Sequence, residues 1–326
     1  EEFNSLKTPK VITNGQYIDL EYQIEAIKIV IDKLNSYDGA ILADVVGLGK
    51  SIISSAVARN MDMKTVIISP PHLIPQWEEY KEQFGIRGSK IFSSGKIQEV
   101  YDRYHESKDP ILFILDEAHR YRNEDTNDYK LLHQVCRSHP ENKVLLLTAT
   151  PFNNDPKDVF ALIKLFQTPG QSTIRSVDNL SLRYRDLIQR YKNLRREMTK
   201  GKDQESINRE ASEIATEQRR LIEPIIIRRS RLDLNYITRY REDLVRQNIS
   251  FAEVKGPDPL EYELGELYDP YIKTLDLIIK PDNAGFIGAR YKPTSENYMN
   301  DENRKKFIEK YKNEFDDVED IRIAQT

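Results

Sequence analysis

Short runs of apolar residues alternate with segments of helical periodicity along the first half of the chain. The runs are AILA at 40–43, TVIISP at 65–70, PILFILDE at 110–117 and KVLLLTATP at 143–151. Residues 17–34, before the first run, and 51–59, after it, repeat apolar side chains at helical spacing. Uninterrupted apolar runs are typical of strands buried on both faces, and their alternation with helices predicts a parallel, doubly wound sheet. The chain is therefore expected to form an α/β domain.

The hydrophobic pattern changes after this domain core, which we assign to residues 1–170. Long polar segments of helical character occupy residues 171–223 and predict a helical protrusion inserted in the domain. PIIIRRS at 224–230 predicts one more strand, so residues 224–234 are expected to close the domain. The pattern of residues 235–326 is weaker and does not predict a fold. Because the chain does not begin with Met, we expect it to be a fragment.

Composition adds limits on the class of protein. The 326 residues are 39% apolar and 31% charged, as in soluble globular proteins, and the net charge is −4, so any nucleic-acid contact must come from local basic patches. No stretch approaches 18 uninterrupted apolar residues, which argues against a membrane partner.

The single cysteine, Cys136, is expected to be a buried thiol in a reducing cytosol. The histidines lack metal-ligand spacing, and we expect no zinc. The expected location is the cytoplasm, with nucleoid association if the protein is bacterial.

Three of the apolar runs end in polar strings that carry candidate chemistry. These strings are ADVVGLGKS at 43–51, LDEAH at 115–119 and LTATP at 147–151. Each is expected to emerge at the carboxyl edge of a buried parallel strand, where open α/β sheets bind their ligands. In this order the three strings predict a nucleoside triphosphatase.

The first string has most of a phosphate-binding loop. Gly47 and Gly49 allow backbone N–H groups to surround anionic oxygens at a helix N-terminus, Lys50 adds a positive charge, and Ser51 offers a hydroxyl to magnesium. Asp44 stands where the common pattern has its first glycine. The alternative is a glycine-rich turn followed by an ordinary surface lysine.

The second string places two carboxylates side by side at a strand end. Adjacent residues of a strand point in different directions, so the two side chains can have separate tasks. Asp116 is expected to hold magnesium, and Glu117 to orient and deprotonate the attacking water. The alternative is a solvated strand end without a chemical role.

With these residues in view, the chain resembles the first motor domain of helicase superfamily 2, and within it the Swi/Snf-type DNA-translocating ATPases. The segments that carry the resemblance are GLGKS preceded by Asp44, PPHLIPQWEEY at 70–80, DEAHRYRN at 116–123 and LTATPFNN at 147–154. The resemblance implies a RecA-like P-loop NTPase fold, ATP and magnesium as cofactors, and double-stranded DNA as partner.

The resemblance also implies roles for individual residues. Gln23 matches a glutamine that binds adenine, and the alternative for it is a solvent-facing helix residue. The triphosphate would be bound by Gly47, Leu48, Gly49, Lys50 and Ser51, magnesium by Ser51 and Asp116, and the catalytic residues would be Lys50, Asp116 and Glu117. His119, Thr148 and Thr150 match residues that couple the nucleotide state to nucleic-acid contact. Nucleic-acid contacts are expected at Pro70, Gln76 and Trp77, although Trp77 could equally pack in the core.

A basic helical segment is a further candidate for a nucleic-acid contact. Residues 180–202 contain eight basic and two acidic side chains, with Arg195 and Arg196 near the centre of the charge. Backbone phosphates require only positive charge, so this segment could grip DNA. The alternative is an ordinary solvated helix face.

The sequence contains no motif that matches the second motor lobe of the family. No string like Gln-x-x-Gly-Arg, whose arginines reach the triphosphate, occurs between residues 230 and 326. The leading hypothesis is the ATP-binding lobe of a double-stranded DNA translocase that remodels protein–DNA complexes and hydrolyses ATP only together with a second lobe in the same polypeptide. Alternatives are the motor part of a restriction or phage-defence system, and a nucleotide-dependent nucleic-acid-binding module without turnover. The isolated chain is expected to be weakly active or inactive.

Overall fold

The computed structural model describes residues 6–86, 88–149, 155–174, 179–199 and 203–251, with a few isolated positions after them. The chain divides into two compact units, residues 1–252 and 253–326. Nearly all of the second unit lies outside the described residues, so of the segment 235–326, for which the sequence predicted no fold, mainly 235–251 is described. The six strands and the helices that pack on them belong to the first unit.

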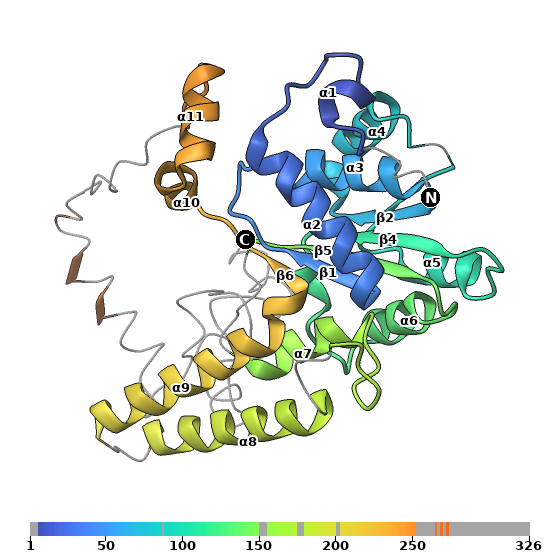
Figure 1. Ribbon diagram of the computed structural model, residues 1–326. Coiled ribbons are helices and arrows are strands. Elements are labelled where there is room, and N and C mark those ends of the chain that lie inside the picture. The colour runs from blue at the N-terminus through green and yellow to red at the C-terminus, as the bar shows by residue number, and fades with distance from the viewer. Residues whose placement is uncertain are drawn as a thin grey trace. The chain divides into compact units, whose positions relative to one another are not determined.

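The core of the first unit is a six-stranded parallel sheet (Figure 1). Its strands are β1 (Gly39–Leu42), β2 (Lys64–Ser69), β3 (Lys90–Ser93), β4 (Ile111–Leu115), β5 (Lys143–Leu147) and β6 (Ile226–Ile227). They are arranged in the order β3-β2-β4-β5-β1-β6, and every neighbouring pair is parallel. The predicted doubly wound parallel sheet is confirmed.

Helices cover both faces of this sheet. One face is packed against α2 (Glu21–Tyr37), α3 (Lys50–Met61) and α4 (Ile74–Gln83), and the other against α5 (Ile97–Tyr104), α6 (Asn127–Cys136) and α7 (Pro156–Lys164). Successive strand residues alternate between the two cores, as a pleated strand requires: Ile41 belongs to one core and Leu42 to the other. Burial of both faces explains why the strands are uninterrupted apolar runs.

The remaining helices in the described part of the chain include a small one near the start. This is α1 (Pro9–Ile12), and single 3-10 turns follow at Pro71–Leu73, Ala118–Tyr121 and Glu223–Ile225. None of the helices among the described residues is long and apolar enough to cross a bilayer. Cys136 is a free, buried thiol at the end of α6, and its burial raises its pKa.

The polar segment after α7 forms a pair of long helices, α8 (Leu180–Thr199) and α9 (Gln204–Ile222), which lie side by side (Figure 1). Leu194 and Ile207 are among the apolar residues buried within this part of the core. Arg190 of α8 is hydrogen-bonded to three glutamates of α9, at positions 210, 213 and 217. The helical character that the sequence predicted for this segment is present, and part of its positive charge is neutralised within the pair.

The sequence did not predict strand β3 or the helices that follow β6. Strand β3 was missed because, among the described strands, it lies at an edge of the sheet and pairs only with β2, and Phe92 is its only buried residue. Helices α10 (Arg231–Tyr236) and α11 (Thr238–Arg246) extend the same compact unit beyond Leu234, where the sequence placed the end of the domain. They contribute Leu234 and Tyr240 to a small third core, which includes Tyr22 of α2 and Leu48 of the phosphate loop.

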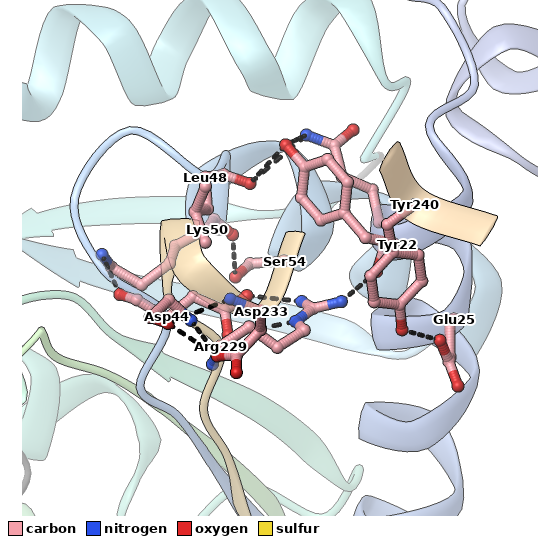
Figure 2. Close-up of polar contacts among 11 residues, drawn as sticks. Tyr22, Glu25, Asp44, Leu48, Lys50, Ser54, Arg229, Asp233 and Tyr240 are labelled. Atoms are coloured by element: carbon pink, nitrogen blue, oxygen red, sulfur yellow. Dashed lines mark hydrogen bonds and ion pairs between the residues drawn. The ribbon is translucent and has the colours of Figure 1, made fainter. Parts of the chain in front are cut away.

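A buried ion pair attaches this last part of the domain to the first strand (Figure 2). Strand β6 adds to the edge of β1, and the pairing continues past it, because Val45 N–H donates to the Arg229 carbonyl at 3.1 Å. The Asp44 carboxylate accepts the backbone N–H of Arg229 at 2.8 Å and its Nε–H at 3.2 Å, while Nη2 donates to the second carboxylate oxygen. Arg229 Nη1 also donates to the carbonyl of Tyr22. Asp44 is 0% exposed and Arg229 8%, so each charge depends on the other.

Loss of either partner should therefore destabilise the folded domain. Arg229→Met is expected to lower the free energy of unfolding by about 3–5 kcal/mol, because it leaves the buried Asp44 carboxylate without a compensating charge. Arg228→Met is the matched control: Arg228 is exposed, and exposed ion pairs contribute less than about 1 kcal/mol. Urea unfolding measures both. Adding Asp44→Asn to Arg229→Met should restore part of the stability, and equal unfolding midpoints for the Arg229 and Arg228 variants would contradict the dependence.

Candidate active site

The register of the sheet brings the three polar strings to one edge. Leu42 pairs with Leu147, and Leu115 pairs with Leu146 and Ile68. The residues that come after these positions therefore share the carboxyl edge of the sheet. Asp44, Asp116, Thr148 and Ser69 all lie there.

The phosphate loop connects β1 to α3, and two of its glycines have backbone conformations that residues with a side chain rarely adopt. Gly47 and Gly49 have φ values of 91° and 83°, in the left-handed region that glycine adopts without strain. A Cβ atom at Gly49 would also lie 2.5 Å from Nε2 of Gln23, so a larger residue would displace a buried side chain. Helix α3 begins directly after Gly49 and has no side-chain cap, so its N-terminus is directed at the loop.

Lys50 lies at the first position of α3, and its ammonium group faces the loop. Its Nζ donates to the Asp44 carbonyl at 2.9 Å (Figure 2). Burial lowers the pKa of Lys50, and the negative charges of Glu117, Asp44 and Asp116 oppose this effect. The two carboxylates of the second string are therefore close enough to act on Lys50. Ser51 is the next residue and is half-buried.

Asp116 is held in place by three donors. Its Oδ2 accepts the indole N–H of Trp77 at 2.9 Å and the hydroxyl of Ser69 at 3.2 Å, and its Oδ1 accepts the backbone N–H of Glu117 at 3.0 Å. Asp116 as a whole is only 7% exposed. Its orientation is fixed by neighbours from two other elements, β2 and α4.

Glu117 has an unusual backbone conformation. Its φ is 51°, which is uncommon for a residue with a side chain. Oε2 of Glu117 lies 3.1 Å from Nδ1 of His119, and both side chains are partly exposed. The carboxylate therefore leaves the strand in a different direction from that of Asp116 and reaches solvent at the edge of the sheet.

The donor set suits a magnesium ion. Magnesium prefers hard oxygen ligands and is usually bound through one or two carboxylates, a substrate phosphate and water. Asp116 supplies a buried carboxylate next to the loop, and Ser51 supplies a hydroxyl at the N-terminus of α3. The residues present therefore fit the ion and its nucleotide.

Gln23 is buried against the phosphate loop and is hydrogen-bonded to it. Its Nε2 donates to the Leu48 carbonyl at 3.3 Å and to the Tyr22 hydroxyl at 3.3 Å, and the residue is 5% exposed. Tyr22 Oη donates to the same Leu48 carbonyl (Figure 2). The alternative of a solvent-facing helix residue is wrong, and in this structure Gln23 supports the loop. Its contact with adenine stays a prediction.

Thr148 and His119, two of the three residues expected to couple the nucleotide state to nucleic-acid contact, are described, and they lie at this same edge of the sheet. Thr148 is 1% exposed, and its backbone N–H donates to the Leu42 carbonyl at 3.2 Å, next to the phosphate loop. His119 is adjacent to Glu117. Thr150 lies outside the described residues.

Two of the nucleic-acid candidates are corrected by their burial. Pro70 and Trp77 are buried, the latter only 1% exposed, so neither can contact DNA in this structure. Trp77 is instead a partner of Asp116. Gln76 is exposed and donates to the Tyr80 hydroxyl at 3.2 Å.

Arg195 and Arg196 are exposed on α8. Arg195 lines a cavity of about 940 Å³ together with Arg122 and Lys157, beside α7 and the α8–α9 pair. Their contact with DNA stays a prediction.

Sequence reasoning missed the roles of Arg229 and Ser69, and it missed the contact of Trp77 with Asp116. One signal for Arg229 was available: a charged residue, Asp44, occupies a position of the loop that ordinarily holds glycine, and a buried charge requires a partner of opposite sign. The sequence does not say which of the later arginines is that partner.

Comparison with known proteins agrees with these features. The profile of the SNF2-related domain family matches residues 86–255, slightly more than half of the chain, beginning after the phosphate loop and including Asp116, Glu117 and Arg229. The chain is 31% identical over 190 residues to an uncharacterized ATP-dependent helicase, YqhH, of Bacillus subtilis, covering 52% of this chain and 32% of that protein. It is 27% identical over 259 residues to the mouse DNA repair and recombination protein RAD54B, covering 69% of this chain and 27% of that protein.

A solved structure is also similar. The SWI2/SNF2 ATPase core of Sulfolobus solfataricus in complex with double-stranded DNA is 19% identical, with a TM-score of 0.49, covering 69% of this chain and 47% of that one. The chain thus spans about a third or less of the two curated relatives. On the match of the family profile, the chain belongs to the SNF2-related domain family.

Proposed function

We propose that this chain is the ATP-binding lobe of an ATP-dependent double-stranded DNA translocase that acts in the cytoplasm. The observation that carries the proposal is the convergence of the phosphate loop, Lys50 and the Asp116–Glu117 pair at one edge of the sheet. A polyphosphate at the N-terminus of α3 would have a lysine on one side and an acid pair on the other. That arrangement serves phosphoryl transfer to water.

Each residue has one task in this proposal. Backbone N–H groups of Gly47, Leu48 and Gly49 bind phosphate oxygens, and Lys50 exchanges the Asp44 carbonyl for the triphosphate. Asp116 and Ser51 would hold magnesium, which when bound neutralises charge on the phosphates. Glu117 orients the attacking water and accepts its proton, since its carboxylate reaches solvent next to the loop. His119 and Thr148 pass the state of this site to the DNA-binding surface.

Double-stranded DNA is proposed as the partner because of the family and its named members. One relative is named as an ATP-dependent helicase, and another as a DNA repair and recombination protein. Family membership also favours a second motor lobe whose arginine completes the site, and a DNA-bound protein as the object that is remodelled. A nucleotide-dependent binding module without turnover is the second candidate. Glu117 argues against it, because binding alone would need the loop but not a base.

The first test concerns ATP binding. Lys50→Ala should weaken binding of Mg·ATP roughly 10- to 100-fold, because hydrogen bonds to a charged group contribute about 1.5–3 kcal/mol each. Isothermal titration calorimetry measures the affinity. Lys28→Ala, an exposed lysine of α2 away from the loop, is the control and should bind as the wild type does. Unchanged affinity in the Lys50 variant would contradict the proposed site.

The second test separates turnover from binding. Glu117→Gln should retain Mg·ATP affinity but reduce DNA-stimulated hydrolysis about 10²- to 10⁴-fold, the usual contribution of a general base. It is best measured in a polypeptide that carries both motor lobes. If hydrolysis by the variant equals that of the wild type, Glu117 is not the base, and if neither protein turns over ATP, the binding-module candidate is favoured.

The third test concerns the second lobe. The chain by itself, with saturating double-stranded DNA, should hydrolyse ATP at least about 10³-fold more slowly than a two-lobe member of the family, because an arginine finger contributes 10³- to 10⁵-fold. A coupled steady-state assay measures both rates under the same conditions. Comparable rates would show that the site is complete within this chain.

A further inference from the structure

Trp77 is the single tryptophan of the chain, and its side chain is directed into the candidate active site. It lies on α4 and is 1% exposed, and its indole N–H donates to Oδ2 of Asp116 at 2.9 Å. The ring is kept in this orientation by an edge-to-face contact with Tyr80, with centroids 6.1 Å apart. Packing alone would require an apolar ring here but not a donor aimed at a carboxylate.

The hydrogen bonds of Asp116 divide its two oxygens into different roles. A carboxylate oxygen has about two lone-pair sites, and Oδ2 already accepts two donors, from Trp77 and Ser69. Oδ1 accepts only the backbone N–H of Glu117 among the contacts of the described residues. One lone pair therefore remains on Oδ1, which leaves this oxygen as the one available to a metal ion.

We propose that Trp77 is a positioning residue that fixes Asp116 so that Oδ1 is presented to magnesium. The proposal rests on the function proposed above, because it assumes that Asp116 binds the ion. Helix α4 carries both the exposed Gln76 and the buried Trp77. Through Trp77 this helix directly contacts the carboxylate that is proposed to bind the metal.

The test uses the Mg²⁺ concentration that gives half-maximal ADP binding, measured by calorimetry on the 326-residue chain. Trp77→Phe retains an aromatic ring but removes the donor, and it should raise that concentration about 10-fold or more, as loss of a hydrogen-bond partner of a metal ligand typically does. Ser69→Ala removes the longer of the two hydrogen bonds to Oδ2. It should also raise the Mg²⁺ concentration for half-maximal binding, by a smaller factor than Trp77→Phe does. Phe84→Leu is the control, since Phe84 is buried in the same core and has no polar contact with Asp116.

The fluorescence of the wild type provides a second measurement that needs no variant. Because Trp77 is the only indole, adding Mg²⁺ to the chain with ADP should change its emission, whereas ADP with a chelator should leave it nearly unchanged. This readout remains informative if Trp77→Phe does not fold.

The outcomes are distinguishable. A shift in Mg²⁺ dependence for Trp77→Phe, absent in Phe84→Leu, supports the assignment. If the wild type binds Mg·ADP and both variants have the same Mg²⁺ dependence, the assignment is overturned and the proposed function stays intact. The same holds if the wild type binds Mg·ADP but its indole emission does not respond to Mg²⁺. If the wild type itself binds no Mg·ADP, the proposed function fails, and this assignment fails with it.

Discussion

Asp44 and Arg229 form a buried ion pair between positions 185 residues apart, and the geometry of the phosphate loop depends on it. Arg229 holds the carboxylate at the start of the loop and also bonds to the carbonyl of Tyr22, whose hydroxyl supports Leu48 inside the loop. Because buried charges must be compensated, the loop has this structure only when the closing segment is in place. The proposed nucleotide site is therefore a property of the complete domain rather than of a local motif.

The same contact explains the one departure from the usual phosphate-loop pattern. In the sequence, Asp44 in place of glycine looks like a loss, since the residue gives up backbone freedom. In the structure its side chain turns away from the loop interior to Arg229, while its carbonyl accepts Lys50. Gly47 and Gly49 supply the positive φ values that the turn requires, so glycine is unnecessary at position 44.

How much the sequence could predict depends on the range of each interaction. The strands and loop were predictable because burial on both faces and glycine at a turn leave local patterns, as in 110–115 and 43–51. The partners of Asp116 and Asp44 were not predictable, because Trp77 and Arg229 come from distant segments and their residue types suit many positions. Trp77 illustrates this limit: the sequence favoured core packing and DNA contact equally, and only the direction of α4 decides between them. Strand β3 was missed since a half-exposed edge strand has no continuous apolar run.

Two groups of the site are thus supported from helices outside it. Asp116 is oriented by α4 through Trp77, and the phosphate loop is supported by the third core, in which Leu48 packs with Leu234 of α10. Close-packed interiors transmit displacement rather than absorb it. A partner that moved α4 would rotate the carboxylate, and one that moved α10 would deform the loop, so the acid pair and the lysine could be brought into or out of alignment separately. In the proposed function hydrolysis requires both groups to be aligned at once, so α4 and α10 are the two helices whose displacement would change that alignment.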